Sequence, residues 1–418
     1  MTQLLTCVRR TLPLRLLSSV TVALGCLLGV GVFLVPALGV ATAGPWLPLA
    51  VLAALLAAWC TVSSSAVLAS ARGRAGDSGS RQHGTHIDLR DHLGVWPARL
   101  SSVAFLAGQV ILAAGIAGVL TDHLWPGGRS WSGPLVIAVA TTLVIARLPR
   151  PRGLGLLPVL VVGVLAIVVA AAVALEPAPS GAPVPVVEIS GVAEAAAMAF
   201  VAFCGFERFT TRGARPRSGV IAPMTIALLA SAALILIVAF AGWHQLGPHR
   251  LGLSPTPLLD LVVAADAAPL ATLVGIAALA AMLPPVIAAL TSARDAMRVS
   301  IVEGDVRWPS RARSDASEPS WSVELVVGLA ACVAVLVLAP AAVLAMGVCL
   351  LLTHYAFLNA SARLIAGEQD TASARRGCTG MFASVILAMS LPVAALAGTA
   401  LVLAFGAAAL ALTARPWR

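Results

Sequence analysis

The basic residues of this chain are separated by long apolar runs and gather on one side of them. All 27 basic residues are Arg; 59% of the 418 residues are hydrophobic and only 11% are charged. If each apolar run crosses a membrane once, every Arg except Arg129 and Arg250 falls on the same side. Loops rich in Arg and Lys stay in the cytoplasm, so this pattern predicts a multi-pass membrane protein with both termini cytoplasmic.

The crossings follow from the length of the apolar runs. A spanning helix needs about 20 mostly apolar residues. Twelve segments meet this requirement, at about 16–40, 46–70, 99–121, 132–147, 154–175, 191–210, 219–243, 268–293, 322–339, 341–364, 379–396 and 398–414. Pro340 and the stretch from Pro392 to Gly398 divide two long runs into hairpins. We therefore predict one all-α transmembrane domain over residues 1–418, with an even number of crossings.

The composition also bears on location and partners. The chain has no Lys and a single Asn, Asn359, beside abundant Ala, Arg and Gly, which is typical of a GC-rich bacterial genome and predicts a bacterial cytoplasmic membrane. Arg occurs in short clusters between apolar runs, so no nucleic-acid partner is expected. The seven Cys form no CxxC pair and are interpreted as small core residues. Membrane lipids are the expected partners, and the oligomeric state stays open.

The first crossing has an irregular centre. Gly29 and Gly31 lie one residue apart there, and two such glycines cost a helix about 2 kcal/mol relative to Ala. One interpretation is close packing of two helices through small residues. The other is an unwound segment whose free backbone groups face a ligand.

The sixth crossing contains a second irregular segment, from Phe200 to Glu207. A carboxylate is costly within a bilayer, so Glu207 is expected to face the bundle interior or water, or to pair with the Arg cluster that begins at Arg208. Two interrupted crossings that stand five apart are typical of an inverted five-helix repeat with a binding site at the midplane.

Both segments match known signatures. Residues Gly29 to Pro36, followed by Gly44 and Pro45, resemble the GxGxFxxP and GP signature of the amino acid–polyamine–organocation permeases, and Phe203 to Glu207 resembles their FxGFE signature. Residues 288–297 and 353–363 also resemble segments of these permeases, but the resemblance is weaker. In its compact length the chain resembles the branch of these permeases that contains bacterial neutral amino-acid exporters.

The resemblance implies a LeuT-like fold and a transport function without enzymatic activity. Its five-plus-five inverted repeat would place repeat 1 at about 16–175, repeat 2 at about 191–364 and two peripheral helices at about 379–414, with helices 1 and 6 discontinuous. The implied function is secondary active transport of amino acids by alternating access.

The residues support a specific binding hypothesis. The half-helix after Gly31 would offer N–H groups to a substrate carboxylate, and carbonyls near Phe203 to Gly205 would accept from its ammonium. The candidate substrate-binding residues are Gly29, Val30, Gly31, Phe33, Val201, Phe203, Cys204, Gly205 and Phe206. Val201 and Ala202 stand where importers of cationic amino acids carry an aromatic residue, which favours small or aliphatic neutral substrates.

Coupling to an ion has two candidates. Glu207 is the candidate for proton coupling, because a low-dielectric site favours the neutral form of a carboxyl. Thr291 and Ser292 are candidate hydroxyl ligands for Na⁺, although ordinary intrahelical bonding is the better explanation of such residues. No cofactor and no structural metal are expected; the cytoplasmic stretch of His83, His86, Asp88, Asp91 and His92 fits no strong zinc signature.

Two other classes of protein remain as alternatives. A major-facilitator-type transporter of another small solute is one, but its loop signature is only approached by Gly73, Asp77, Gly79 and Arg81, and the long loop between halves is missing. A membrane-embedded lipid-linked transferase needs acids or a nucleophile gathered at one face. The outer-face candidates are scattered: Asp122, His123, Glu176, Glu188, His244, Asp260 and Asp266.

Overall fold

The computed structural model describes most of the chain as helices. The described residues are 16–75, 89–128, 131–147, 155–175, 190–210, 217–308, 321–367 and 370–413, and they contain no strand. The elements are Leu16–Leu27, α2 (Val30–Ala43), the 3₁₀ helix η1 (Gly44–Trp46), α3 (Leu47–Ala75), α5 (Val95–Leu124), α6 (Ser132–Ala146), α7 (Leu157–Ala174), α8 (Ser190–Ala199), η3 (Phe200–Phe203), α9 (Glu207–Thr210), α10 (Arg217–Leu253), α11 (Pro257–Ala264), η4 (Ala268–Leu270), α12 (Ala271–Val302), α13 (Trp321–Val337), α14 (Pro340–Ala366), α15 (Thr371–Met389) and α16 (Val393–Thr413).

The helices have the length and composition of membrane spans. Within the described residues, seven helical stretches are long and apolar enough to cross a bilayer, and four further apolar helices have 10–17 residues. The chain is therefore a multi-pass membrane protein, as the sequence predicts. The number of crossings, twelve by sequence, stays a prediction.

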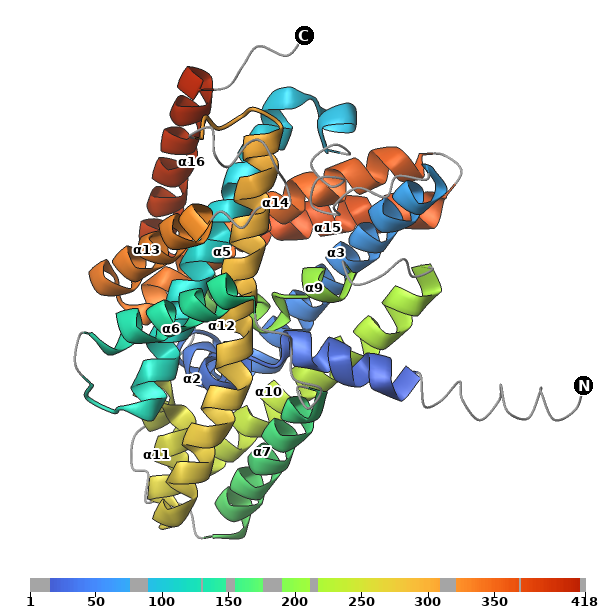
Figure 1. The fold of residues 1–418 in the computed structure, drawn as a ribbon. Coiled ribbons are helices and arrows are strands. Elements are labelled where there is room, and N and C mark those ends of the chain that lie inside the picture. Colours follow the sequence, from blue (N-terminus) through green and yellow to red (C-terminus); the bar gives the residue numbers. More distant parts are fainter. Residues whose placement is uncertain are drawn as a thin grey trace, which may run out of the picture.

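Burial separates a central group of helices from a peripheral group. The most apolar window of α5 is 78% buried, whereas those of α7 and α16 are only 28% and 17% buried. Large apolar side chains stand exposed on the peripheral helices, such as Phe405 and Leu412 on α16. Exposed apolar surface of this extent suits lipid rather than water. In Figure 1, α2 lies in the middle of the bundle and α12 runs along its length.

The two long apolar runs are divided at prolines. Pro340 opens α14 directly after α13, as expected. The second division differs from the prediction, because α15 covers Thr371–Met389 and α16 already begins at Val393. Two local signals set these bounds: Asp370 caps the start of α15 by accepting from the Ser373 N–H at 3.1 Å, and Pro392 precedes α16.

Candidate functional site

The first crossing is broken at two residues. Helix Leu16–Leu27 ends before Leu28 and Gly29, and α2 begins at Val30. The break is therefore shorter than the unwound segment expected from the sequence, since Val30 and Gly31 belong to the first turn of α2. Gly29 is the N-cap and provides no side-chain cap. The first N–H groups of α2 have no acceptor within their own helix and form its positive end.

The sixth crossing is broken over a longer segment. The α-helical winding of α8 stops at Ala199; η3 and a turn over Cys204, Gly205 and Phe206 follow before α9. The Cys204 N–H donates to the Val201 carbonyl at 3.3 Å. Gly205 has φ +107°, a conformation that only glycine adopts without strain. The Gly205 N–H donates to Glu207 Oε2 at 3.1 Å, so this carboxylate holds the turn of its own break.

The two breaks lie against each other. A β-carbon built on Gly31 would come within 2.2 Å of the Ala202 Cβ and 2.4 Å of its Cα. Gly31 therefore permits the start of α2 to touch η3. Both interpretations of the glycine pair, close packing and a broken helix, therefore apply. Gly31 allows close packing, and the element packed against it belongs to the other broken crossing.

The predicted substrate-binding residues gather around this contact and are closed off from solvent. Phe33, Phe203 and Phe206 are completely buried. The remaining members of the set are also buried: Gly29, Val30, Gly31, Val201, Cys204 and Gly205. Glu207, the proposed coupling residue, is partly buried beside them.

Tyr355 on α14 contacts the second break and holds it in place. It is the only Tyr of the chain and is fully buried. Its hydroxyl donates to Glu207 Oε1, and its ring packs on Phe200 and Phe206 at centroid distances of 5.8 and 5.1 Å. Tyr355 is not among the site residues predicted from the sequence. A lone Tyr within an apolar helix was the available signal, because a buried hydroxyl needs a partner.

The neighbouring His354 ties α14 to α5. Its Nδ1 lies 2.8 Å from Ser101 Oγ and 3.2 Å from the Ser101 carbonyl. Its ring also contacts Phe105 at 4.8 Å. Two consecutive residues of α14 therefore contact different parts of the molecule. His354 contacts α5, and Tyr355 contacts the second break.

A second imidazole meets the first break. The ring of His123, near the end of α5, stands edge-on to Phe33 at 5.4 Å. Its Nδ1 lies 2.9 Å from the Val119 carbonyl, while its buried Nε2 has no hydrogen-bond partner among the described residues. By sequence, His123 is only one of several scattered outer-face residues.

Helix α12 approaches the first break through a proline. A β-carbon on Gly29 would lie 3.3 Å from Pro285 Cγ and 3.8 Å from the Ala281 carbonyl oxygen. Pro285 has no N–H, so the Ala281 carbonyl lacks its usual helical donor. This carbonyl is a polar group of the site that the sequence analysis missed, although Pro284 and Pro285 inside an apolar run were its signal.

The proposed sodium ligands stand farther along α12. Thr291 and Ser292 follow Pro285 by six and seven residues, which is about 9 to 10 Å along a helix axis. The Thr291 hydroxyl donates to the Ile287 carbonyl at 2.7 Å within its own helix.

Two stretches considered in the sequence, the histidine and aspartate stretch and the loop compared with the major-facilitator signature, fall largely within residues 76–88. These residues lie outside the described part of the chain, and they include Asp77, Gly79, Arg81, His83, His86 and Asp88.

The chain is similar in sequence to proteins that are named transporters. No family model matches the chain. Two curated relatives, from Mycobacterium tuberculosis and Mycobacterium bovis, are each 28% identical over 405 residues, covering 95% of this chain and 90% of their own length, and both are named uncharacterized transporters. The similarity thus extends over nearly the whole chain, including both broken crossings.

Proposed function

We propose that this chain is a secondary transporter that moves small or aliphatic neutral amino acids across the bacterial cytoplasmic membrane by alternating access. The observation that carries the proposal is the buried contact between the two broken helices at Gly31 and Ala202. Broken helices that meet within a bundle are the usual construction of a midplane binding site. The relatives named transporters support the same class of function.

The chemistry of the breaks suits an amino-acid zwitterion. The start of α2 presents N–H groups and a positive dipole end, which favour a carboxylate. The end of α8 and the turn after it present carbonyls, which accept from an ammonium. Neither role needs a charged side chain. The apolar residues around the breaks, Phe33, Val201 and Phe206, would surround an apolar substrate side chain.

Alternating access requires that the packing around the site has two arrangements. We propose that repeat 1, at about 16–175, and repeat 2, at about 191–364, rock against each other, and that the break in crossing six loosens during this motion as the hydrogen bond from Tyr355 to Glu207 opens. Both of these residues belong to the second repeat. The bond therefore controls how firmly the break in crossing six is held, rather than joining the halves.

Glu207 is the proposed proton-coupling residue. In the structure its two carboxylate oxygens accept from two donors, the Tyr355 hydroxyl and the Gly205 N–H. Protonation would weaken both bonds, because a neutral carboxyl is a poorer acceptor than a carboxylate. Proton binding would therefore loosen the second break. Sodium coupling through Thr291 and Ser292 stays the alternative.

The first test is ligand binding by the purified protein. A ligand that binds only the folded state raises the melting temperature, so we expect alanine, valine or leucine to raise it and sugars to leave it unchanged. Uptake of the same labelled amino acids into proteoliposomes should follow the same ranking. A clear shift with sugars and none with the neutral amino acids would reject the proposed substrate class.

A further inference from the structure

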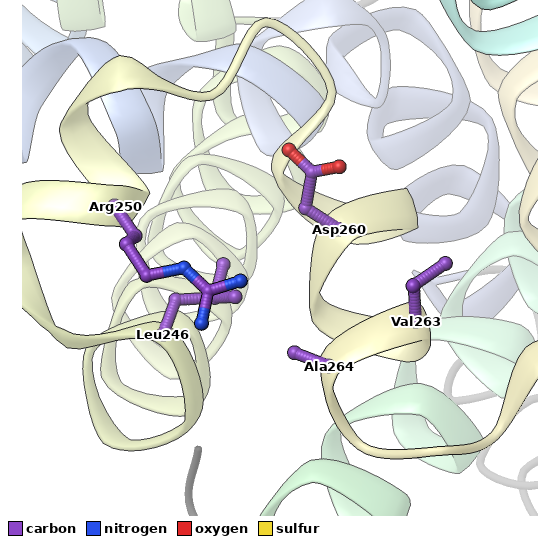
Figure 2. A pocket seen from close by; sticks show the side chains of 5 residues that line it. All are labelled: Leu246, Arg250, Asp260, Val263 and Ala264. Carbon is purple, nitrogen blue, oxygen red and sulfur yellow. The ribbon is translucent and has the colours of Figure 1, made fainter. Parts of the chain in front are cut away.

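A charged cavity lies outside the proposed transport site, between the end of α10 and α11. It has a volume of about 310 Å³ and is lined by Leu246, Arg250, Asp260, Val263 and Ala264. Figure 2 shows Arg250 on one wall and Asp260 on the opposite wall. Arg250 belongs to the pair of Arg residues that the charge pattern places on the outer side, so the cavity is expected to open there.

Local structure fixes both charged residues. Arg250 follows a kink of α10 at Gly247, which has φ +72°. Asp260 lies in the first turn of α11, and its Oδ2 accepts from the Ser254 hydroxyl. Ser254 Oγ in turn accepts from the Thr256 N–H at 3.2 Å. The turn before α11 thus positions the Asp260 carboxylate.

The opposite charges face the cavity without pairing with each other. Among the described residues Arg250 and Asp260 form no ion pair with each other, and the Asp260 carboxylate accepts from Ser254 instead. A guanidinium binds a carboxylate through two parallel hydrogen bonds, and a carboxylate binds an ammonium. A simple anion would be repelled by Asp260 and a simple cation by Arg250. The pair therefore favours a ligand that carries both charges.

The rest of the lining is apolar. Leu246, Val263 and Ala264 complete the wall and would contact an aliphatic side chain. The volume is at the lower end of the range for small-molecule sites, about 300 to 1,000 Å³. Both properties suit a neutral amino acid with a small or aliphatic side chain.

The cavity is also connected to the first break. His123 lies close enough to Asp260 for an electrostatic interaction, and its ring contacts Phe33 of α2. Helix α11 packs on α2 as well. His123 therefore links the charged cavity to Phe33.

We propose that Arg250 and Asp260 form a peripheral binding site for zwitterionic amino acids at the outer mouth of the transporter. Arg250 binds the substrate carboxylate and Asp260 binds its ammonium, before the substrate reaches the broken helices or after it leaves them. This site rests on the proposed function, because it takes the same substrate class. Its charged side chains distinguish it from the central site, which uses backbone groups.

The test combines two variants with three ligands. Leucine carries both charges, leucinamide lacks the carboxylate and 2-hydroxyisocaproate lacks the ammonium. Arg250→Gln should weaken binding of leucine and 2-hydroxyisocaproate about three- to ten-fold, the range for one charge-assisted contact at a partly exposed site, and should strengthen binding of leucinamide, which Arg250 repels. Asp260→Asn should weaken leucine and leucinamide by a similar factor and should strengthen 2-hydroxyisocaproate, which Asp260 repels.

The matched controls are His249→Gln and Asp266→Asn, two exposed neighbours that do not line the cavity. Equal binding of all three ligands by Arg250→Gln, Asp260→Asn and the controls would overturn the site. If the wild type transports leucine and the variants have unchanged KM, only the peripheral site fails. If leucine binds in a charge-dependent manner but is not transported, the proposed function fails and the site stands.

Discussion

Gly31 and Ala202, 171 residues apart in the sequence, lie so close that a β-carbon on Gly31 would come within 2.2 Å of the Ala202 Cβ. The contact joins the first turn of α2 to the 3₁₀ turn that ends the regular winding of α8. Because interiors are closely packed, such a contact admits few alternatives. It fixes how near the two broken helices come, and with it the size of any site between them.

Gly31→Ala should therefore disturb the site more than an ordinary Gly→Ala change. Overpacking costs about 1 to 3 kcal/mol, so we expect a lower melting temperature and at least a ten-fold loss of amino-acid uptake. Gly163→Ala on α7 is the matched control, since a β-carbon there meets nothing within 4 Å. Adding Ala202→Gly should restore Gly31→Ala only in part, because the Ala202 Cα also lies within 2.4 Å of the new atom. Wild-type uptake in Gly31→Ala would show that the contact does not matter.

Gly205→Ala tests the second break. Its φ of +107° is strained for any residue with a β-carbon, at about 1 to 3 kcal/mol. The variant should lower thermal stability and reduce the stabilisation that a bound neutral amino acid provides. Both effects are measured in one thermal-shift titration, again beside Gly163→Ala. A variant with unchanged stability and ligand response would mean that the turn rearranges freely.

Tyr355→Phe isolates the hydroxyl that holds Glu207. The ring contacts with Phe200 and Phe206 are kept, and the lost bond to a charged acceptor is worth about 1.5 to 3 kcal/mol. We expect a lower uptake rate and a pH profile that moves to higher pH, because a carboxylate that has lost a donor holds its proton more tightly. The readout is initial uptake between pH 5 and 8. A profile that stays at the same pH would show that the Tyr355 hydroxyl does not bear on proton binding by Glu207.

Glu207→Gln tests proton coupling directly. Gln is isosteric but does not titrate, so uptake should lose its dependence on pH and a proton gradient should no longer drive accumulation. Proteoliposomes with an imposed pH difference measure both properties. If accumulation still follows the gradient, Glu207 is not the coupling residue, and Thr291 and Ser292 become the sites to vary, with sodium replacing the proton gradient.

Arg99 and Asp305 form a buried ion pair at 2.8 Å, with side chains only 8% and 2% exposed. Arg99→Ala should destabilise the protein by about 3 to 5 kcal/mol, because it removes the ion-pair partner of a buried carboxylate. Arg90→Ala is the control: the Arg90–Glu303 pair at 3.3 Å is more exposed, with 26% of the Arg90 side chain accessible, and should cost about 0 to 1 kcal/mol. Comparable losses of stability in the two variants would contradict this difference in burial.

The sequence by itself determined that the chain is a multi-pass membrane protein and where two of its crossings break. Long apolar runs report the solvent and one-sided Arg clusters predict the side of each loop, and both are local properties of the chain. Gly29 and the segment from Cys204 to Phe206 likewise mark breaks through their own backbone preferences. Helix ends were less certain, because capping and packing shift them by a few residues; α2 starts at Val30, and α15 and α16 meet at residues 390–392.

Only the tertiary structure decided which groups meet. The partners of Glu207 include Tyr355, 148 residues away, and the partners of Gly29 and Gly31 lie on α12 and η3. Arg250 and Asp260 face each other because of a kink in α10 and the turn before α11. No periodicity encodes such pairs, because a helix repeat specifies which face is buried but not which helix covers it. The physical reason is that these contacts arise from the packing of whole helices, in which many distant residues act together.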